Sequence, residues 1–194
     1  MASSARSSIS LATPVTDRQQ RYIAQPKLDL GDKPLRPVGY WEMDGWDDRA
    51  VDAQARAAIS AGHPIPVSRY PLLREYNGAT GQERRDCGNR YIIGRELGLI
   101  PWPKFCSVCC STRFVGAHNE VYARPCSAMP VCRSCHRLAH RRFIDPSPWL
   151  MRVAQHAYEG AWFTKIGLTE LTREQMLWLS RQDDPFDVKQ LGQA

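Results

Sequence analysis

The sequence lacks any long apolar segment and any internal repeat. A transmembrane helix needs about 18 or more consecutive apolar residues, and no such run occurs. The first residues, Met1 to Leu11, are rich in Ser and Ala but lack the apolar core of a secretory signal. No Gly-rich loop has the spacing of a phosphate-binding motif. We therefore expect a cytoplasmic protein that has no membrane partner.

Acidic residues are almost missing from residues 101–144, where Glu120 is the sole one. The same segment contains seven basic residues: Lys104, Arg113, Arg124, Arg133, Arg137, Arg141 and Arg142. Seven positive charges and one negative charge give this segment the whole chain's net charge of +6. Such an excess favours a polyanionic partner, and nucleic acid, DNA above all, is the partner we expect. A solvated charged face is the alternative interpretation.

Cysteines occur in two Cys-x-x-Cys pairs, with 22 residues between the inner cysteines. Each pair can present two thiolates from one turn, and together the pairs complete the tetrahedral shell of a structural zinc site. The predicted zinc ligands are Cys106, Cys109, Cys132 and Cys135. Free thiols or disulfides are the alternative.

The other three cysteines, Cys87, Cys110 and Cys126, have no such pairing, which makes the total of seven odd. Unpaired thiols fit a reducing compartment and support the cytoplasmic assignment.

A helix is predicted from about Cys132 to Phe143, and it carries a histidine pair. His136 and His140 have the i, i+4 spacing of two metal ligands on one helix face. With His118, at the end of a predicted strand over 111–118, three imidazoles could converge. The alternatives are a buttressing role for His118 and a surface or zinc-supporting role for His140.

Three arginines lie beside these histidines on the same predicted helix. At about 100° per residue, Arg133, Arg137 and Arg141 form an i, i+4, i+8 stripe next to the histidine face. Arginine side chains suit phosphate binding, so this stripe is the predicted nucleic-acid contact.

Two helices are predicted upstream of the cysteines. The first spans 47–60 and can be capped by Asp47 or Asp48. The second spans 80–97, where Thr80 and Glu83 have the spacing of a capping box.

Two further helices are predicted downstream. Ser147 as N-cap and Pro148 as first residue predict a helix from Trp149 to Glu159. Thr172, with Gln175 three residues on, predicts the start of the last helix. Trp162 and Phe163 between them are predicted core residues.

These elements predict a mainly helical α+β protein. Its expected parts are a disordered or weakly ordered arm (1–35), a helical region (36–100), a zinc-binding module (101–144) and C-terminal helices (145–194).

The central segment resembles the zinc-containing branch of the HNH (His-Me finger) endonucleases, particularly short phage and bacterial members. The resemblance rests on the order Cys106-x2-Cys109, then Ala117-His118-Asn119-Glu120-x-Tyr122-x-x-Pro125, then Cys132-x2-Cys135-His136-x3-His140. It implies a ββα-metal, treble-clef-like module stapled by Zn²⁺. It also implies a second divalent ion such as Mg²⁺ at the histidines and catalytic roles for His118, His136 and His140.

One part of the segment departs from that family. Active members show His-His or Asp-His at the strand end, whereas this chain has Ala117-His118-Asn119. Two functions therefore remain open: a metal-dependent DNA endonuclease of HNH type, or a non-catalytic zinc module. The second would act as a phage or mobile-element regulator or inhibitor that binds nucleic acid or a protein partner.

Overall fold

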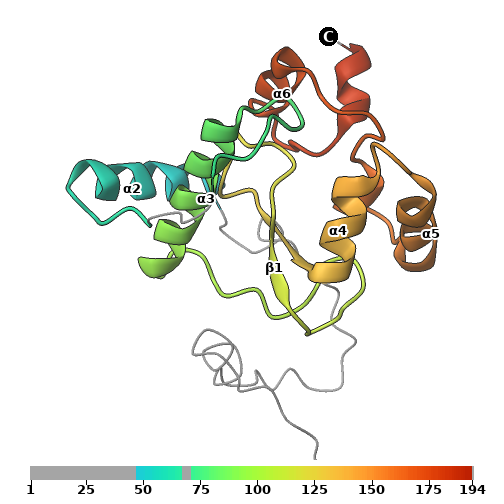
Figure 1. The fold of residues 1–194 in the computed structure, drawn as a ribbon, viewed down its shortest axis with the longest axis horizontal. Coiled ribbons are helices and arrows are strands. Elements are labelled where there is room, and N and C mark those ends of the chain that lie inside the picture. The colour runs from blue at the N-terminus through green and yellow to red at the C-terminus, as the bar shows by residue number, and fades with distance from the viewer. Residues whose placement is uncertain (1–46, 67–70, 194) are drawn as a thin grey trace, which may run out of the picture. The chain divides into compact units, whose positions relative to one another are not determined.

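The computed structural model describes residues 47–66 and 71–193. That part contains five α-helices and one two-stranded sheet, which confirms an α+β, mainly helical protein. The predicted arm over 1–35 lies outside the described residues. The elements are α2 (Asp48–Ser60), α3 (Gly81–Glu96), β1 (Val115–His118), β2 (Met129–Cys132), α4 (Arg133–Arg141), α5 (Ser147–His156), η2 (Trp162–Thr164), α6 (Arg173–Leu179) and η3 (Val188–Gln193) (Figure 1).

Three predicted helix starts are confirmed by their capping contacts. The Asp47 side chain accepts hydrogen bonds from the first backbone amides of α2. Thr80 and Glu83 form a reciprocal capping box at α3, and Thr172 and Gln175 form another at α6. Each contact satisfies an amide that the helix itself leaves unpaired.

The predicted cap of α5 is wrong. Ser147 is the first helical residue, Pro146 occupies the cap position, and no side chain caps the helix. Instead the Asp145 carboxylate accepts a hydrogen bond from the Ser147 amide at 3.2 Å. The helix therefore starts before the predicted Trp149, and it ends at His156.

The sheet is an antiparallel hairpin in which Val115 pairs with Cys132 and His118 pairs with Met129. The first strand is shorter than the predicted 111–118, because Phe114 has a left-handed backbone (φ 50°) that interrupts an extended chain. Since β2 runs directly into α4, the hairpin places the start of α4 beside the start of β1.

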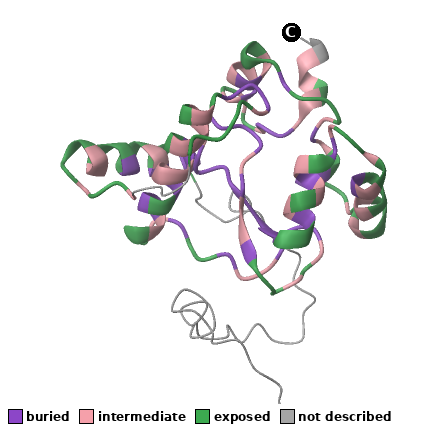
Figure 2. Cartoon of the chain, in the orientation of Figure 1, coloured by how far each residue is buried: buried purple, intermediate pink, exposed green. Residues whose placement is uncertain are grey.

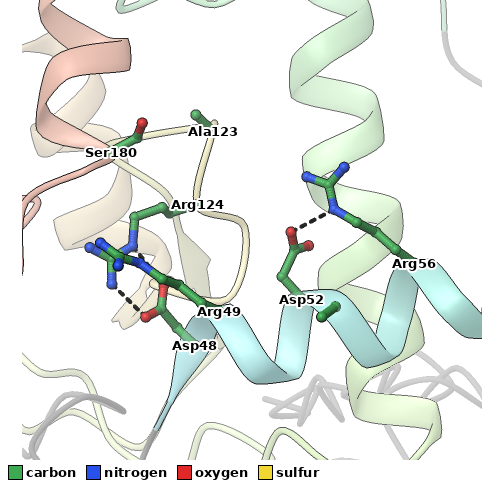
Figure 3. A pocket seen from close by; sticks show the side chains of 8 residues that line it. Asp48, Arg49, Asp52, Arg56, Ala123, Arg124 and Ser180 are labelled. Atoms are coloured by element: carbon green, nitrogen blue, oxygen red, sulfur yellow. Dashed lines mark hydrogen bonds and ion pairs between the residues drawn. The ribbon is translucent and has the colours of Figure 1, made fainter.

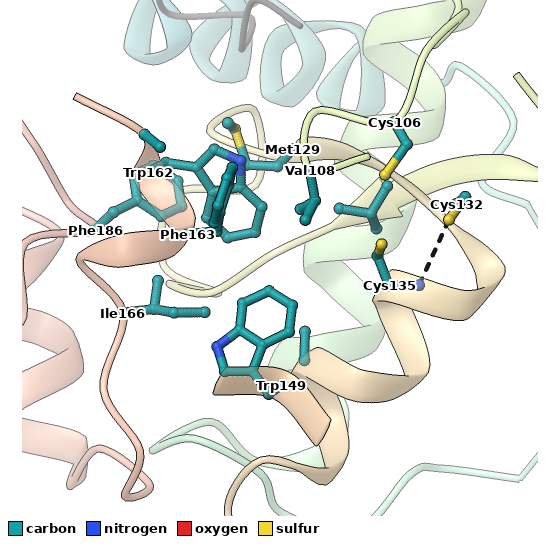
Figure 4. Close-up of a cluster of buried hydrophobic side chains, with 13 residues drawn as sticks. Cys106, Val108, Met129, Cys132, Cys135, Trp149, Trp162, Phe163, Ile166 and Phe186 are labelled. Atoms are coloured by element: carbon teal, nitrogen blue, oxygen red, sulfur yellow. Dashed lines mark hydrogen bonds between the residues drawn. The ribbon is translucent and has the colours of Figure 1, made fainter. Parts of the chain in front are cut away.

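The largest core cluster lies beneath the hairpin, α4 and α5. Trp149, Trp162 and Phe163 are almost fully buried in it, as predicted for Trp162 and Phe163, and the same cluster contains Cys135 (Figure 4). Figure 2 shows α4 with a buried face toward this core and an exposed face opposite. No helix in the described ranges has the length and apolarity needed to cross a membrane.

Candidate metal centres on helix α4

Four cysteines converge at the start of α4. Cys106 and Cys109 come from the loop before β1, Cys132 ends β2, and Cys135 lies in the first turn of α4. Their sulfur atoms all lie within 4.8 Å of one another. The cluster contains the four ligands that were predicted from the Cys-x-x-Cys spacing.

Backbone hydrogen bonds shape the loop that carries the first pair. The Cys110 amide donates to the Cys106 carbonyl at 2.9 Å, and the Cys106 amide donates to the Ser111 carbonyl at 2.9 Å. Buried Ser107 ties the loop to β2, because both its amide and its hydroxyl donate to the Pro130 carbonyl at 2.7 Å. These contacts fix the first pair against the strand that leads to the second.

The thiols differ in acidity. A hydrogen bond from Cys135 holds the pKa of Cys106 below its usual value. Burial raises the pKa of Cys109 to about 11, and the hydrogen bond with Cys106 raises that of Cys135. Four converging sulfur donors fit a soft or borderline cation, so the cluster is compatible with a structural metal.

Three histidines form a second cluster on the same hairpin and helix. His118 lies at the end of β1, while His136 and His140 lie one turn apart on α4. One nitrogen of each lies within 4.8 Å of the other two. The ring of His118 lies 5.2 Å from that of His136 and 5.1 Å from that of His140, centre to centre. The predicted convergence of three imidazoles therefore occurs.

A buried ionic network fixes the orientation of His118. Its Nε2 lies 3.0 Å from a carboxylate oxygen of Glu120, and both side chains are almost completely buried. Burial alone would raise the pKa of Glu120, but the charge of Arg142 and the hydrogen bond from His118 hold it below its usual value. Because a carboxylate can only accept, His118 carries its proton on Nε2.

The other ring nitrogen of His118 has no such bond. His118 Nδ1 is buried and has no hydrogen-bond partner in the described part of the chain. A buried, unsatisfied ring nitrogen is unfavourable unless something occupies its lone pair. Imidazole bonded to a carboxylate through one nitrogen is the usual arrangement of a metal-ligating histidine. The residues therefore fit a metal ion at this cluster.

His136 and His140 are neutral at physiological pH. Burial lowers the pKa of His136 to about 3 and that of His140 to about 2. Their Nε2 atoms lie 2.9 Å apart. Neutral imidazoles are the form that coordinates metal, so this pair completes a donor set with His118.

The residues that flank His118 do not supply a general base. Ala117 has no ligand atom, and the Asn119 side-chain amide donates to the Pro125 carbonyl at 2.9 Å. The Glu120 carboxylate is bonded to His118, Arg142 and Asn77. The site thus has three imidazoles and no free base beside them in the sequence.

Arg133, Arg137 and Arg141 are all exposed on α4, as the predicted stripe requires. Arg142, which the sequence offered merely as one more basic residue, is instead fully buried. It donates to Glu120 and, at 2.6 Å, to the Gly167 carbonyl. Sequence reasoning missed this role because nothing in the local spacing separates Arg142 from its exposed neighbours.

Asn77 was also missed. Its side-chain amide donates to the Glu120 backbone carbonyl at 2.8 Å and to the Glu120 carboxylate at 3.0 Å. Its Oδ1 accepts from the Leu171 amide at 2.8 Å. The turn-forming pair Asn77-Gly78 was the one available signal, and it indicates a turn rather than a partner.

A separate pocket of about 350 Å³ lies between α2, Ala123 and Ser180 (Figure 3). Its charged side chains bond to one another or to carbonyl groups. Arg124 pairs with Asp48, Arg56 pairs with Asp52, and Arg49 donates to the Arg181 carbonyl at 2.9 Å. We interpret these contacts as joining α2 to the C-terminal part of the chain.

The buried network predicts that Glu120→Gln weakens metal binding at the histidine cluster. A Gln side chain can still accept from His118, but it lacks the charge that makes the imidazole a stronger ligand. Loss of such a supporting group typically lowers metal affinity 10- to 100-fold. Calorimetric titration of a divalent ion into protein whose cysteine cluster is already loaded measures this change.

Asp48→Asn is the matched control, because Asp48 is also a buried carboxylate paired with an arginine but lies on α2. Both variants should lose stability in urea, since each leaves an arginine without its charge partner. Equal affinity of the two variants for the ion would contradict the role of Glu120.

Searches of family models, of curated proteins and of solved structures found no match to this chain, so the assignment of these centres stands on their geometry.

Proposed function

We propose that this chain is a zinc-stapled, HNH-like protein that binds DNA and hydrolyses phosphodiester bonds with a divalent ion at the histidine cluster. One observation carries the proposal: three imidazoles converge at α4, on the helix that also carries the exposed arginines. The hairpin followed by a helix is the element order of a ββα-metal, treble-clef-like module.

Zinc is the proposed ion of the cysteine cluster. Four sulfur donors without an oxygen or nitrogen donor are the usual closed shell of structural Zn²⁺. All four cysteines lie outside the histidine cluster, so the two centres have separate ligand sets.

The histidine cluster is the proposed reaction site. A divalent ion there supplies Lewis-acid polarisation of a phosphate oxygen and activation of water at neutral pH. His118 is held in one tautomer by Glu120, which keeps Nδ1 available as a ligand atom. Arg133, Arg137 and Arg141 hold the nucleic-acid backbone next to the cluster.

Cleavage of a supercoiled plasmid tests this proposal. Purified protein should convert the plasmid to nicked and linear forms in the presence of Mg²⁺, Mn²⁺ or Ni²⁺, and a chelator should stop the reaction. The absence of a general base at Asn119 predicts slow turnover compared with a site that has one, because such a base contributes about 10²–10⁴-fold.

A second candidate function is favoured by the Asn119 contact. The Asn119 side chain donates to the Pro125 carbonyl, and an amide cannot serve as a general base. The second candidate is therefore a non-catalytic binding scaffold that regulates or inhibits through nucleic acid. Tight DNA binding without cleavage in any of the three metals would select this function over the first.

The arginine stripe predicts salt-dependent binding. Replacing Arg133, Arg137 and Arg141 with Ala should weaken binding to every DNA sequence and reduce the log-affinity versus log-salt slope by up to about three contacts, at roughly 0.9 per contact. Fluorescence anisotropy across a salt series measures both effects.

The control triple replaces Arg49, Arg56 and Arg181, which are also exposed and lie on α2 or just after α6 rather than on α4. It removes the same charge. If the two triples weaken binding equally, net charge rather than the stripe governs binding.

A further inference from the structure

Phe114 has an unfavourable position in the fold. It is 69% exposed, so its ring gains little from burial. Its backbone is also left-handed, with φ 50°. Gly, Asn and Asp adopt that conformation readily, whereas it is strained for a bulky side chain.

Strain without burial usually marks a position selected for something other than stability. Among the described residues, Asn77 and Cys110 are the other non-glycine positions with positive φ. Asn77 is a residue type that tolerates this backbone, and its side chain is buried and bonded. Phe114 is not a residue type that tolerates this backbone, and its side chain is exposed.

The surroundings of Phe114 are basic. The Arg133 amide donates to the Phe114 carbonyl at 3.1 Å, so Phe114 lies at the first residue of the arginine stripe. Arg113, the preceding residue, is exposed as well. Glu120, the one acidic residue of 101–144, is buried and paired with Arg142, so it does not offset these charges at the surface.

We propose that Phe114 stacks on an unpaired nucleobase of a nucleic acid whose backbone follows Arg133, Arg137 and Arg141. The proposal rests on the proposed nucleic-acid function and names the part of the ligand that this end of the stripe contacts. An exposed aromatic ring offers a base a stacking surface whatever the sequence, and neighbouring arginines bind the flanking phosphates. Strain at Phe114 is tolerated because this turn must present the ring outward.

The test is the variant Phe114→Asn, which should move stability and binding in opposite directions. Asn accepts the left-handed backbone, so the urea midpoint of unfolding should rise. Binding to a labelled single-stranded oligonucleotide should weaken roughly 5- to 150-fold, which corresponds to about 1–3 kcal/mol per stacked base. Phe114→Trp should keep the affinity, and Phe114→Leu should lose it, because stacking requires an aromatic face.

Cys110→Gly is the matched control, since Cys110 has the same kind of backbone in the same loop (φ 58°) and no ring. It should raise stability and leave binding unchanged. The oligonucleotides should be a single strand, a duplex with one unpaired base and a fully paired duplex, at one salt concentration. Phe114→Asn should weaken binding to the first two much more than to the third.

Two results would overturn the inference and leave the proposed function standing. One is unchanged affinity of Phe114→Asn for all three oligonucleotides. The other is an equal loss for the paired duplex, which would show that no unpaired base is recognised. If the wild-type protein binds none of the three, the proposed nucleic-acid function itself fails, and this inference fails with it.

Discussion

Cys132→Ser is expected to release the metal ion and to unfold at least residues 101–144. Binding of structural Zn²⁺ contributes about 10–16 kcal/mol in zinc-finger peptides at neutral pH. Whole domains are stable by only about 5–15 kcal/mol. Losing one of four thiolates therefore removes stabilisation comparable to the entire folding free energy. Metal analysis and circular dichroism of the purified variant measure the two effects.

The choice of serine separates metal loss from capping loss. The Cys132 sulfur also accepts a hydrogen bond from the Cys135 amide at 3.5 Å, as the N-cap of α4. Serine is a good N-cap residue, so the helix keeps its cap. The control is Cys110→Ser, which changes an exposed thiol outside the cluster. A Cys132→Ser variant that is as well folded as this control would contradict a structural metal at the cysteines.

His136→Ala is expected to abolish plasmid cleavage without loss of the ion held by the cysteines. His136 lies in the histidine cluster and outside the sulfur cluster. Since it is half-buried on α4, its removal should disturb folding less than removal of fully buried His118. His118→Ala should likewise end cleavage. His156→Ala, on α5, should have wild-type activity.

Asn119→His tests the same site by a gain of cleavage activity instead of a loss. If the histidine cluster is catalytic and lacks only a base, an imidazole at position 119 should raise cleavage by about 10²–10⁴-fold. Ala117→Asp is the alternative change, and it gives the Asp-His pair of the endonucleases that the segment resembles. If neither variant cleaves the plasmid and the wild type does not cleave it either, the binding scaffold is the remaining function.

Local signals in the sequence predicted much of this structure. Thr80 and Glu83 of the capping box are three positions apart, and so are the two cysteines of each Cys-x-x-Cys pair. Such spacings are determined by helix and turn geometry, so they can be recognised without knowledge of the tertiary fold. The i, i+4 histidines and the arginine stripe were predictable for the same reason.

Features that depend on distant partners were not predictable. Glu120 meets Asn77 across 43 residues and Arg142 across 22. No periodicity links such positions, so the sequence could not show that Arg142 turns inward while Arg141 stays exposed. The predicted cap of α5 was wrong for a different, local reason: Asp145 and Ser147 lie two residues apart, both are good capping residues, and the local pattern does not decide between them.

Equilibrium dialysis of the wild-type protein against Zn²⁺, followed by metal analysis, tests the central claim most directly. The two separate clusters on one hairpin and helix predict that two ions bind per chain. They also predict that His136→Ala retains one of them. A wild-type protein that is well folded at neutral pH and binds no ion would contradict the account.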